Sequence, residues 1–387
     1  MKIVAVTSRF PHPMERGDKL RAQHQLRELA RHHDVALIAL SEGPVPAEHL
    51  DVLSGAGVRT HVVQRSRATT AFAGARAALR MPVQVAYFRS TGVETEVRRL
   101  IEAESPDRLY CQLIRTAWAV EGTGVPAVID YQDAFAAAMK RRAAGQPPGA
   151  RHAFEYESTR IAAAEAAAFE AFERRVVISE QDRLSLEVPD RDAVDVLPNG
   201  VDTSFFAPGG EPPADPVDIA FVGNMGYPPN VRAARMLAEE IMPLVRRQRP
   251  GSRLLLAGAR PSRSVRGLAG PHVEVSGWMQ DIREGYRRAS VMVAPLFIGS
   301  GQQNKVLEAM AMGVPVVTTD LVNNAIGAEP GHELVTASTA QEFADSALEL
   351  LESADRRDAV AEAGLKMVQA RFAWNAVGER LSGIIAS

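Results

Sequence analysis

The sequence has little that would suit an oxidising compartment, a membrane-spanning protein or a nucleic-acid partner. Cys111 is the single cysteine among 387 residues, which excludes an internal disulfide and a cysteine-based zinc site and fits a reducing cytoplasm. No apolar run approaches the ~18 residues that a membrane-spanning helix needs, and the first residues lack the layout of a signal segment. The net charge of −3 gives no general attraction to nucleic acid. We therefore expect a cytoplasmic protein that is at most peripheral to a membrane and has no nucleic-acid partner.

The length and the order of apolar segments predict two α/β domains. A chain of 387 residues exceeds the size at which single cores usually stop growing. Short apolar runs alternate with helical patterns in both halves, which favours parallel sheets covered on both faces. Pro, Asn and Gly at 197–202 and a Pro- and Gly-rich stretch at 208–216 mark the boundary between the halves. Two doubly wound halves in one chain predict a ligand cleft between them.

The expected strands are short and the expected helices amphipathic. In the first half strands are predicted at Lys2–Thr7, Asp34–Leu40, Thr60–Val63, Arg108–Gln112, Ala127–Asp130 and Arg175–Ser179, and helices at Gly17–Arg31, Ala47–Ser54 and Arg151–Arg174. In the second half strands are predicted at Asp218–Gly223, Arg253–Ala257, His272–Ser276 and Val291–Pro295, and helices at Asn230–Gln248, Asp281–Ala289 and Lys305–Met312. Neither half carries Gly-x-Gly-x-x-Gly after its first strand, which counts against a dinucleotide-binding domain.

The most informative stretch is 299–317, Gly-Ser-Gly-Gln-Gln-Asn-Lys-Val-Leu-Glu-Ala-Met-Ala-Met-Gly-Val-Pro-Val-Val. A Gly-rich loop here leads into a helix, and the N–H groups and dipole at a helix start favour an anion. Lys305 in the first turn opposes that dipole unless an anion is bound nearby, and Glu308 lies close enough to act in the same site. The stretch therefore predicts a phosphate-bearing ligand held by loop amides and a lysine. The alternative is an ordinary helix start with a surface lysine.

This stretch resembles the donor-site signature Lys-x-x-Glu-Ala-Met-Ala-x-Gly-x-Pro-Val-Val of retaining glycosyltransferases of family 4, which have the GT-B fold. Segments at 196–206, 221–225, 256–258 and 275–278 are also similar to the family, in its order and spacing. One departure concerns the Glu-x7-Glu pattern that members often carry, because Ser300 occupies the first position. The variant with Gln-Asn-Lys before the helix resembles a subgroup associated with bacterial exopolysaccharide or surface-glycan clusters.

The resemblance implies two Rossmann-like domains with an interdomain cleft. On this interpretation residues 1–200 bind the acceptor, residues 201–370 bind a nucleotide-sugar donor, and 371–387 form a helix that crosses back to the first domain. The donor implied is a nucleoside diphosphate sugar, most simply of the UDP or GDP type. The acceptor implied is a small molecule, a saccharide or a lipid-linked compound. No Asp-x-Asp motif is placed to hold a diphosphate-bound magnesium ion, so no metal and no other cofactor is expected.

Side chains must then supply the positive charge for the departing diphosphate. Lys305 is the first candidate. Arg260, after the strand that ends at Ala257, is a second candidate, with a plain surface arginine as its alternative. Many relatives have cations in the loop after the first strand of the second domain, but here that loop begins Asn224-Met225 and has none.

Glu308 resembles the family's carboxylate that holds the ribose or sugar hydroxyls; its alternative is a pairing with Lys305. Trp278 could stack on the nucleotide base or could pack between domains. The donor-binding residues expected are Gly17, Gly223, Asn224, Arg260, Trp278, Ser300, Gly301, Gln302, Gln303, Asn304, Lys305 and Glu308.

In the first half the signals are weaker. Gly17 lies where relatives have a Gly-rich loop that approaches the diphosphate and the acceptor. Asp133 follows an apolar run where relatives present a His or Asp near the reacting carbon, and could orient a sugar hydroxyl or the acceptor. Asp130 is predicted to cap the following helix. The catalytic residues expected are Asp133, Lys305 and Glu308.

The resemblance thus implies a retaining, metal-independent glycosyltransferase of the hexosyltransferase type in bacterial glycan or glycosylated-metabolite biosynthesis. No residue stands out as a nucleophile, in keeping with a same-face mechanism in which the leaving phosphate takes the acceptor proton. A GT-B relative with other chemistry, such as an inverting transferase or an epimerase, is one alternative. A non-catalytic GT-B protein that acts as a partner or scaffold is the other.

Overall fold

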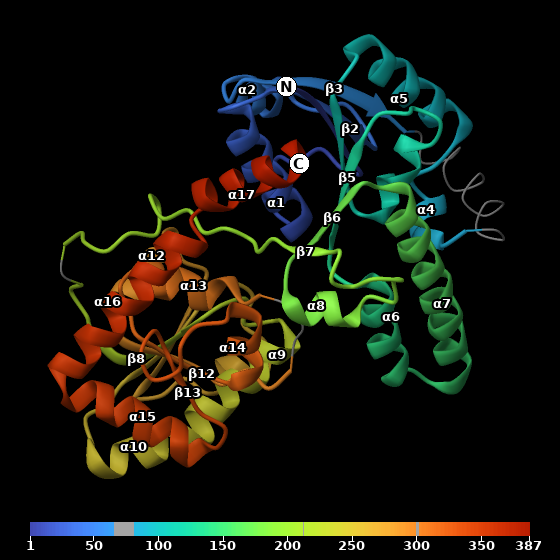
Figure 1. The fold of residues 1–387 in the computed structure, drawn as a ribbon. Helices are drawn as coiled ribbons and strands as arrows, with labels where there is room; N and C mark the ends of the chain where they lie inside the picture. The colour runs from blue at the N-terminus through green and yellow to red at the C-terminus, as the bar shows by residue number, and fades with distance from the viewer. Residues whose placement is uncertain (66–80, 212, 299–301) are drawn as a thin grey trace. The chain divides into compact units, whose positions relative to one another are not determined.

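The computed structural model describes residues 1–65, 81–211, 213–298 and 302–387, and the chain divides into two compact units (Figure 1). The first unit contains Met1–Gly200 together with Val377–Ser387, and the second contains Val201–Ala376. Each unit is built on its own parallel sheet, as the alternation of strands and helices predicts. No helix in the described part of the chain is long and apolar enough to span a membrane.

The first unit has a parallel sheet of seven strands in the order β3-β2-β1-β4-β5-β6-β7. Its strands are β1 Lys2–Thr7, β2 Asp34–Ser41, β3 Val58–Gln64, β4 Arg108–Gln112, β5 Ala127–Gln132, β6 Arg174–Val177 and β7 Asp195–Val196. Its helices are α1 Gly17–Ala30, α2 Ala47–Ser54, α4 Val83–Ala86, α5 Thr91–Glu104, the 3₁₀ helix η1 Ile114–Val120, α6 Phe135–Ala144, α7 Pro148–Ala171 and α8 Glu180–Ser185. The strand order reverses between β1 and β4, which is the mark of a doubly wound sheet.

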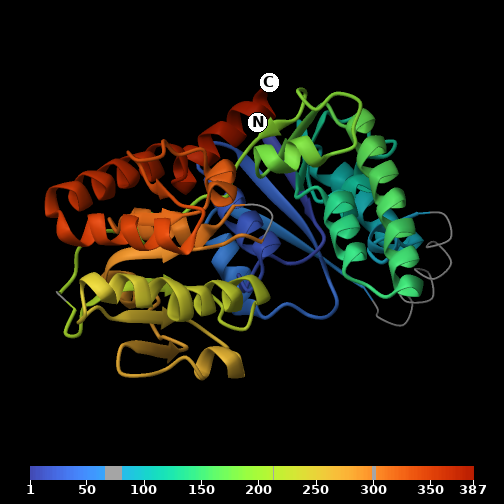
Figure 2. The ribbon, with the colours of Figure 1, turned by 90° about the horizontal axis from the view of Figure 1, so that it is seen from below.

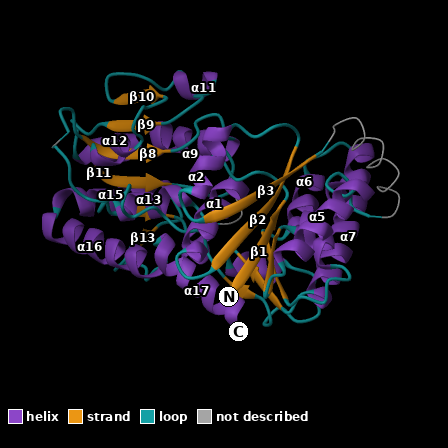
Figure 3. Cartoon of the chain, turned by 90° about the horizontal axis from the view of Figure 1, so that it is seen from above, coloured by secondary structure: helices purple, strands orange, loops and turns teal. Residues whose placement is uncertain are grey.

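Helices cover both faces of this first sheet. Helices α1 and α2 lie on one face, and α5, α6 and α7 lie on the other (Figure 3), where η1 contacts α5 and α7. The end of the chain packs against α1, because a Cβ added at Gly378 would lie 2.3 Å from the Cβ of Glu28. Burial on both faces explains why the central strand β1 reads as a continuous apolar run, with Ile3, Val4, Ala5 and Val6 all fully buried.

The second unit has a parallel sheet of six strands in the order β10-β9-β8-β11-β12-β13, with its reversal between β8 and β11. Its strands are β8 Val217–Val222, β9 Leu254–Ala257, β10 Val273–Gly277, β11 Ala289–Ala294, β12 Val316–Thr318 and β13 Val335–Thr336. Its helices are α9 Pro228–Met236, the π-helical segment η2 Leu237–Ile241, α10 Met242–Gln248, α11 Arg263–Arg266, α12 Arg283–Arg287, α13 Asn304–Ala311, α14 Asp320–Ile326, α15 Ala340–Glu352, α16 Ala354–Arg371 and α17 Trp374–Ala386, whose residues from Val377 onward belong to the first unit.

The sequence predicts one α-helix over Asn230–Gln248, whereas the structure interrupts it with the π-helical segment η2. Figure 2 shows α9, η2 and α10 as one yellow helical ribbon. Pro243 lies two residues beyond the π segment. A proline inside an α-helix has no N–H to donate and clashes with the carbonyl four residues earlier, here that of Glu239. The wider π turn removes this conflict without ending the helix.

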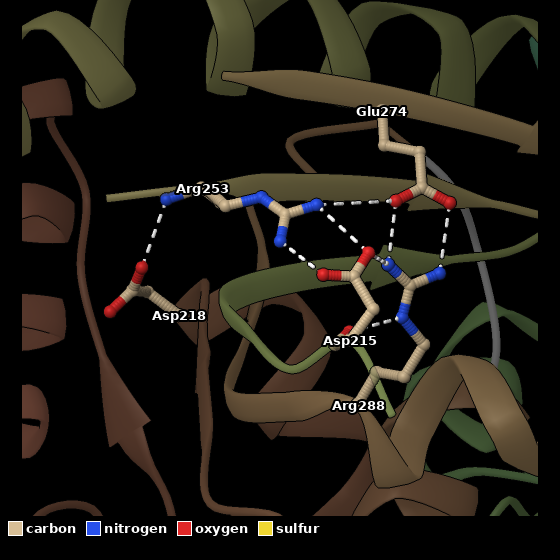
Figure 4. A network of polar contacts seen from close by, with 5 residues as sticks. All are labelled: Asp215, Asp218, Arg253, Glu274 and Arg288. Atoms are coloured by element: carbon tan, nitrogen blue, oxygen red, sulfur yellow. Dashed lines mark hydrogen bonds and ion pairs between the residues drawn. The ribbon is translucent and has the colours of Figure 1, made fainter. Parts of the chain in front are cut away.

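A network of ion pairs joins the amino-terminal ends of four neighbouring strands in the second unit (Figure 4). The Arg288 guanidinium donates to both carboxylate oxygens of Glu274, at 2.8 and 2.6 Å, and to Asp215 at 2.9 Å. The backbone N–H of Arg253 donates to Asp218 at 2.9 Å. The hydrogen bond from Arg288 holds the pKa of Glu274 below its usual value, so the pair is ionised near neutral pH. This network therefore stabilises the end of the sheet opposite to the strand ends discussed next.

Candidate functional site

The predicted donor-site lysine lies at the point where the strand order of the second sheet reverses. Lys305 is in the first turn of α13, which follows β11, and its Nζ donates to Oδ1 of Asn230 on α9 at 2.7 Å. A longer contact of 3.4 Å joins Nζ to Oε1 of Gln303, and the Phe221 ring centroid is 5.5 Å away. Burial lowers the pKa of Lys305 to about 8, because the charged ammonium is poorly hydrated there; Glu308 acts in the opposite direction.

Gly223, the residue after β8, has no room for a side chain. A Cβ at this position would lie 2.9 Å from Nδ2 of Asn230 and 3.3 Å from Cε of Lys305. The Nδ2 group of Asn230 also donates to the backbone carbonyl of Asn224 at 2.9 Å. Asn230 therefore ties the loop after β8 to the lysine on α13, and Gly223 allows the two to meet.

Gly258, after β9, makes an even closer backbone approach. Its φ of 132° is one that other residues rarely adopt, and a Cβ here would lie 1.9 Å from the carbonyl oxygen of Gly223. The N–H of Gly223 in turn donates to the carbonyl of Ala257 at 2.9 Å. The two glycines bring the loops after β8 and β9 together at the same edge of the sheet.

Arg260 follows in the same loop and lies beside Gly226. A Cβ added at Gly226 would lie 2.8 Å from the Arg260 carbonyl oxygen, and the φ of Arg260 is 56°. The Arg260 side chain is exposed, and within the described residues no hydrogen bond or ion pair holds its guanidinium. The side chain is thus available to a ligand at this edge, and its role in donor binding stays a prediction.

Glu308, one turn after Lys305, is held by a tyrosine that the sequence reading missed. The hydroxyl of Tyr286 on α12 donates to Oε2 of Glu308 at 2.6 Å. Burial raises the pKa of Glu308, which the tyrosine hydrogen bond and the charge of Lys305 partly offset. Tyr286 is 1% exposed. A fixed carboxylate thus stands on the same helix face as the fixed ammonium.

The remaining residues of the motif surround the start of α13. Gln302 and Gln303 precede the helix and Asn304 is its first residue. The side-chain oxygen of Asn304 is buried and, among the described residues, has no hydrogen-bond partner. Ser300 and Gly301, predicted to face the donor sugar, lie outside the described residues. Trp278, directly after β10, is 72% exposed, and its role in base stacking stays a prediction.

The predicted site residues of the first unit are less constrained. Gly17 is the first residue of α1, is exposed, and would accept a Cβ without a neighbour within 4 Å. Asp133 follows β5; it keeps an exposed surface, but protein atoms crowd its carboxyl. The resulting loss of hydration, with the charge of Asp182, raises the pKa of Asp133 to about 6. Such a carboxyl changes protonation near pH 6, and the catalytic role of Asp133 stays a prediction.

The prediction that Asp130 caps the following helix is wrong. Asp130 is fully buried and accepts from Arg21 Nε at 2.7 Å, from the Tyr110 hydroxyl at 2.6 Å and from Gln25 at 3.1 Å. The N-cap of α6 is Ala134, which has no side chain to cap with. The charge of Arg21 inside the unit requires a carboxylate partner, and Asp130 meets that need.

Within residues 1–65, 81–211, 213–298 and 302–387, no group of three or more His, Cys, Asp or Glu side chains is arranged to hold a metal ion.

Two comparisons by sequence connect this chain to known proteins. Residues 216–353 match the family model described as glycosyl transferases group 1. The chain is 29% identical over 218 residues to the phosphatidyl-myo-inositol mannosyltransferase of Mycobacterium tuberculosis (strain ATCC 25618 / H37Rv), which covers 51% of this chain and 55% of the relative. It is also 29% identical over 216 residues to the GDP-mannose-dependent monoacylated alpha-(1-6)-phosphatidylinositol monomannoside mannosyltransferase of Corynebacterium glutamicum, covering 49% and 55%. The match spans about half the length of these curated relatives.

Solved structures are similar over the whole chain. Sucrose-phosphate synthase from Thermosynechococcus elongatus superposes with a TM-score of 0.66 and 17% identity, covering 99% of this chain and 98% of that one. Anabaena HepE in complex with UDP superposes with a TM-score of 0.70 and 14% identity, covering both chains completely at 100%. At such identities the likeness defines the fold.

Two doubly wound parallel units in one chain, with structural neighbours that cover its whole length, show the GT-B fold. The family model and the mannosyltransferase relatives support a glycosyltransferase of the family 4 type, which the motif resembles, and the structural neighbours support its GT-B fold.

Proposed function

We propose that the protein is a retaining glycosyltransferase that moves a sugar from a nucleoside diphosphate sugar to an acceptor hydroxyl, in bacterial glycan or glycosylated-metabolite biosynthesis. The observation that carries the proposal is the environment of Lys305. Its ammonium is held by the neutral Asn230, and no carboxylate of the described residues lies within ion-pair distance. A partly buried cation without a directly paired carboxylate is stabilised by an anionic ligand, and a diphosphate would bind beside it at the start of α13.

Glu308 would hold the hydroxyls of the ribose or the transferred sugar. Tyr286 fixes Oε2 of this carboxylate, so Oε1 is the atom that we assign to a donor hydroxyl. Arg260 would add a second positive charge from the loop after β9. These roles need no metal ion, because Lys305, Arg260 and the amides of α13 would together neutralise the charge that develops on the leaving diphosphate.

Retention follows in this proposal from a same-face reaction. The bond between the anomeric carbon and the diphosphate oxygen breaks, the acceptor oxygen bonds to that carbon from the same side, and the leaving phosphate oxygen takes the acceptor proton. Asp133 of the first unit would orient a sugar hydroxyl or the acceptor. The mannosyltransferase relatives act on phosphatidylinositol-based acceptors according to their names; here the acceptor is left as a hydroxyl compound of small-molecule, saccharide or lipid-linked type.

Replacing the lysine tests the donor site directly. Lys305→Ala should weaken binding of the preferred nucleoside diphosphate by ~1.5–3 kcal/mol, the range for a charge-assisted contact, which is roughly 10- to 150-fold in affinity. Isothermal titration calorimetry with UDP and GDP measures it. Lys366→Ala is the matched control, because Lys366 lies on α16 with 71% of its side chain exposed. Equal affinities of the Lys305→Ala and unaltered proteins for every nucleotide would remove this lysine from the donor site.

The stereochemistry is tested separately. With the donor that the titration selects, proton NMR of the product should show the anomeric configuration of the donor. An inverted product would assign the chain to inverting GT-B enzymes. Binding without turnover of any acceptor would favour a partner or scaffold protein.

A further inference from the structure

The first unit contains a cavity of about 470 Å³ that none of the proposed donor contacts uses. It lies at the carboxyl ends of β1 and β2, where Ser8 and Arg9 follow β1 and Ser41 and Glu42 end and follow β2. Ligands of doubly wound sheets bind at this end of the strands. The cavity is therefore placed where a small ligand of the first unit would bind.

The deepest charge on its wall is Arg65. This residue is 5% exposed, and its guanidinium lies 4.9 Å from the Tyr87 ring and 4.5 Å from the Phe88 ring. Nη1 donates to the Tyr87 carbonyl at 2.6 Å, whereas Nε is buried and has no hydrogen-bond partner among the described residues. The carboxylate nearest to it is that of the exposed Glu42, 3.5 Å from Nη2. An arginine this buried usually has its charge matched and its donors satisfied, and this one retains an unused donor.

Three further cations line the same cavity: Arg9, Arg16 and Lys19. Asp18 pairs with Arg9 at 2.5 Å. Burial and the nearby charge of Arg9 lower the pKa of Arg115, which is 4.0 Å from Asp18, to about 10. Glu15 and Glu42 are the carboxylates of the lining, and the four cations Arg65, Arg9, Arg16 and Lys19 outnumber them even when Asp18 is counted.

We infer that this cavity binds a phosphate-type oxyanion carried by the acceptor, held between Arg65, Arg9, Arg16 and Lys19. Guanidinium groups match oxyanions with two parallel hydrogen bonds, and the added negative charge removes the repulsion among the cations. His12 and His49, whose rings lie 4.7 Å apart, line the cavity as well. The assignment of this anion to the acceptor rests on the proposed glycosyl transfer, whereas the presence of an anion site does not.

Two exposed or half-buried cations of the wall can be removed without touching the packed Arg65. The test variant is Arg16→Gln with Lys19→Gln, made in the Lys305→Ala background so that the donor site does not contribute. The matched control is Lys140→Gln with Arg142→Gln in the same background. Both control residues are exposed on α6 of the same unit, outside the cavity lining, so the change in net charge is equal.

Calorimetric titration with glycerol phosphate at constant ionic strength is the first measurement. The Lys305→Ala protein should bind it, the control should bind equally well, and the Arg16→Gln/Lys19→Gln protein should bind at least tenfold more weakly. Equal binding of glycerol phosphate by all three proteins would contradict the anion site. The anion site would also be contradicted if the Lys305→Ala protein bound neither glycerol phosphate nor the vesicles of the next assay. Unchanged nucleotide binding by the Lys305→Ala protein would contradict the donor-site proposal. The glycerol phosphate and vesicle measurements test the anion site, so the failure of one proposal can be told from the failure of the other.

Co-sedimentation with vesicles separates the sources of the anion. Phosphatidylcholine vesicles with and without phosphatidylinositol are compared for the same proteins. Binding that needs phosphatidylinositol and is lost in the Arg16→Gln/Lys19→Gln protein assigns the anion to a lipid headgroup. Binding of glycerol phosphate alone assigns it to a soluble phosphorylated acceptor. Vesicle binding that the test variant and the control share equally would contradict a role for this cavity.

Discussion

At the scale of single residues, the donor-site proposal depends on the protonation of Lys305. Its pKa of about 8 lies below the ordinary value of 10.5, so part of the population is neutral just above neutral pH. A bound diphosphate favours the charged form and raises this pKa. Binding must then take up a proton wherever the free lysine is partly neutral.

We therefore expect the affinity for a nucleoside diphosphate to fall as pH rises through about 8, by at most roughly tenfold per pH unit. Calorimetric titrations in buffers of different ionisation enthalpy measure the proton uptake. The affinity of the Lys305→Ala protein should depend less on pH, and nucleotide binding to this protein should take up fewer protons. A steep profile that is the same in both proteins would assign the pH dependence to another group.

Gly258 gives a second residue-scale prediction, this time for stability. Gly258→Ala would place a Cβ 1.9 Å from the Gly223 carbonyl oxygen at a φ of 132°. The clash and the strained backbone should together lower the free energy of unfolding by about 3 kcal/mol or more. Urea denaturation measures it. Gly149→Ala is the control, because a Cβ there meets nothing within 4 Å in helix α7 and should stabilise by roughly 0.5–1 kcal/mol. Equal stability of Gly258→Ala and the unaltered protein would contradict the close approach.

The sequence indicates some residues of the site and not others, for a physical reason. Lys305, Glu308 and Gly223 stand out because they lie in segments that resemble the family, and Lys305 also because a cation in the first turn of a helix opposes the helix dipole. Asn230 and Tyr286 do not, since each acts through a partner far away in sequence. Only the packing of α9 and α12 against the strand ends brings them to Lys305 and Glu308.

At the scale of elements, a buried carboxylate on helix α7 accepts a hydrogen bond from the first turn of helix α6. Helix α6 has no side-chain cap of its own, and the backbone N–H of Ala136 donates to Glu165 on α7 at 3.2 Å. Glu165 is fully buried, and burial raises its pKa from 4.5 to about 7 against the effect of these backbone donors. The folded protein thus binds this proton between about pH 4.5 and 7, whereas the unfolded chain does not.

The stability contributed by this proton is present at low pH and is lost as pH rises through about 7. Above that pH the ionised Glu165 costs ~3 kcal/mol by this shift. Glu165→Gln keeps an oxygen for the Ala136 N–H and cannot ionise. Its advantage over the unaltered protein should therefore grow by ~1–3 kcal/mol between about pH 5 and about pH 8. Denaturant titrations at both pH values measure it, with Glu170→Gln, exposed on the same helix, as control. A difference that does not change with pH would show that Glu165 does not titrate in this range.

The bounds of a helix or strand are predictable from the sequence when the residues of that element alone determine them. The strands Lys2–Thr7 and Arg108–Gln112 and the helix Ala47–Ser54 coincide with the sequence prediction. The helix predicted at Arg151–Arg174 spans Pro148–Ala171 instead, because Arg174 and Arg175 pair with β5 as part of strand β6. That pairing is a property of the sheet, and the local Ala-rich pattern contains no sign of it.

At the scale of the whole molecule, the sequence predicts that both units contain doubly wound parallel sheets, but it does not predict the order of the strands in each sheet. Alternating strands and helices indicate parallel doubly wound sheets, and the motif resemblance extends this to the GT-B fold. The strand order in each unit, with its reversals at β1–β4 and β8–β11, depends on which strands pair. These reversals matter, because Lys305 and Gly223 follow the two adjacent strands at one of them.

A ligand that binds only the folded state must stabilise it, and this gives the prediction for the complete chain. At a concentration of about 100 times its dissociation constant, the preferred nucleotide should stabilise the protein by ~2.7 kcal/mol, which is a rise of several degrees in the melting temperature. The panel is UDP, GDP, dTDP, ADP and CMP, each with and without EDTA, measured by scanning calorimetry. We expect one diphosphate to give the largest shift, with no change on adding EDTA and with a smaller shift for Lys305→Ala. A shift that EDTA abolishes would mean that a metal ion supplies part of the charge assigned here to Lys305 and Arg260, and no shift with any nucleotide would favour the scaffold alternative.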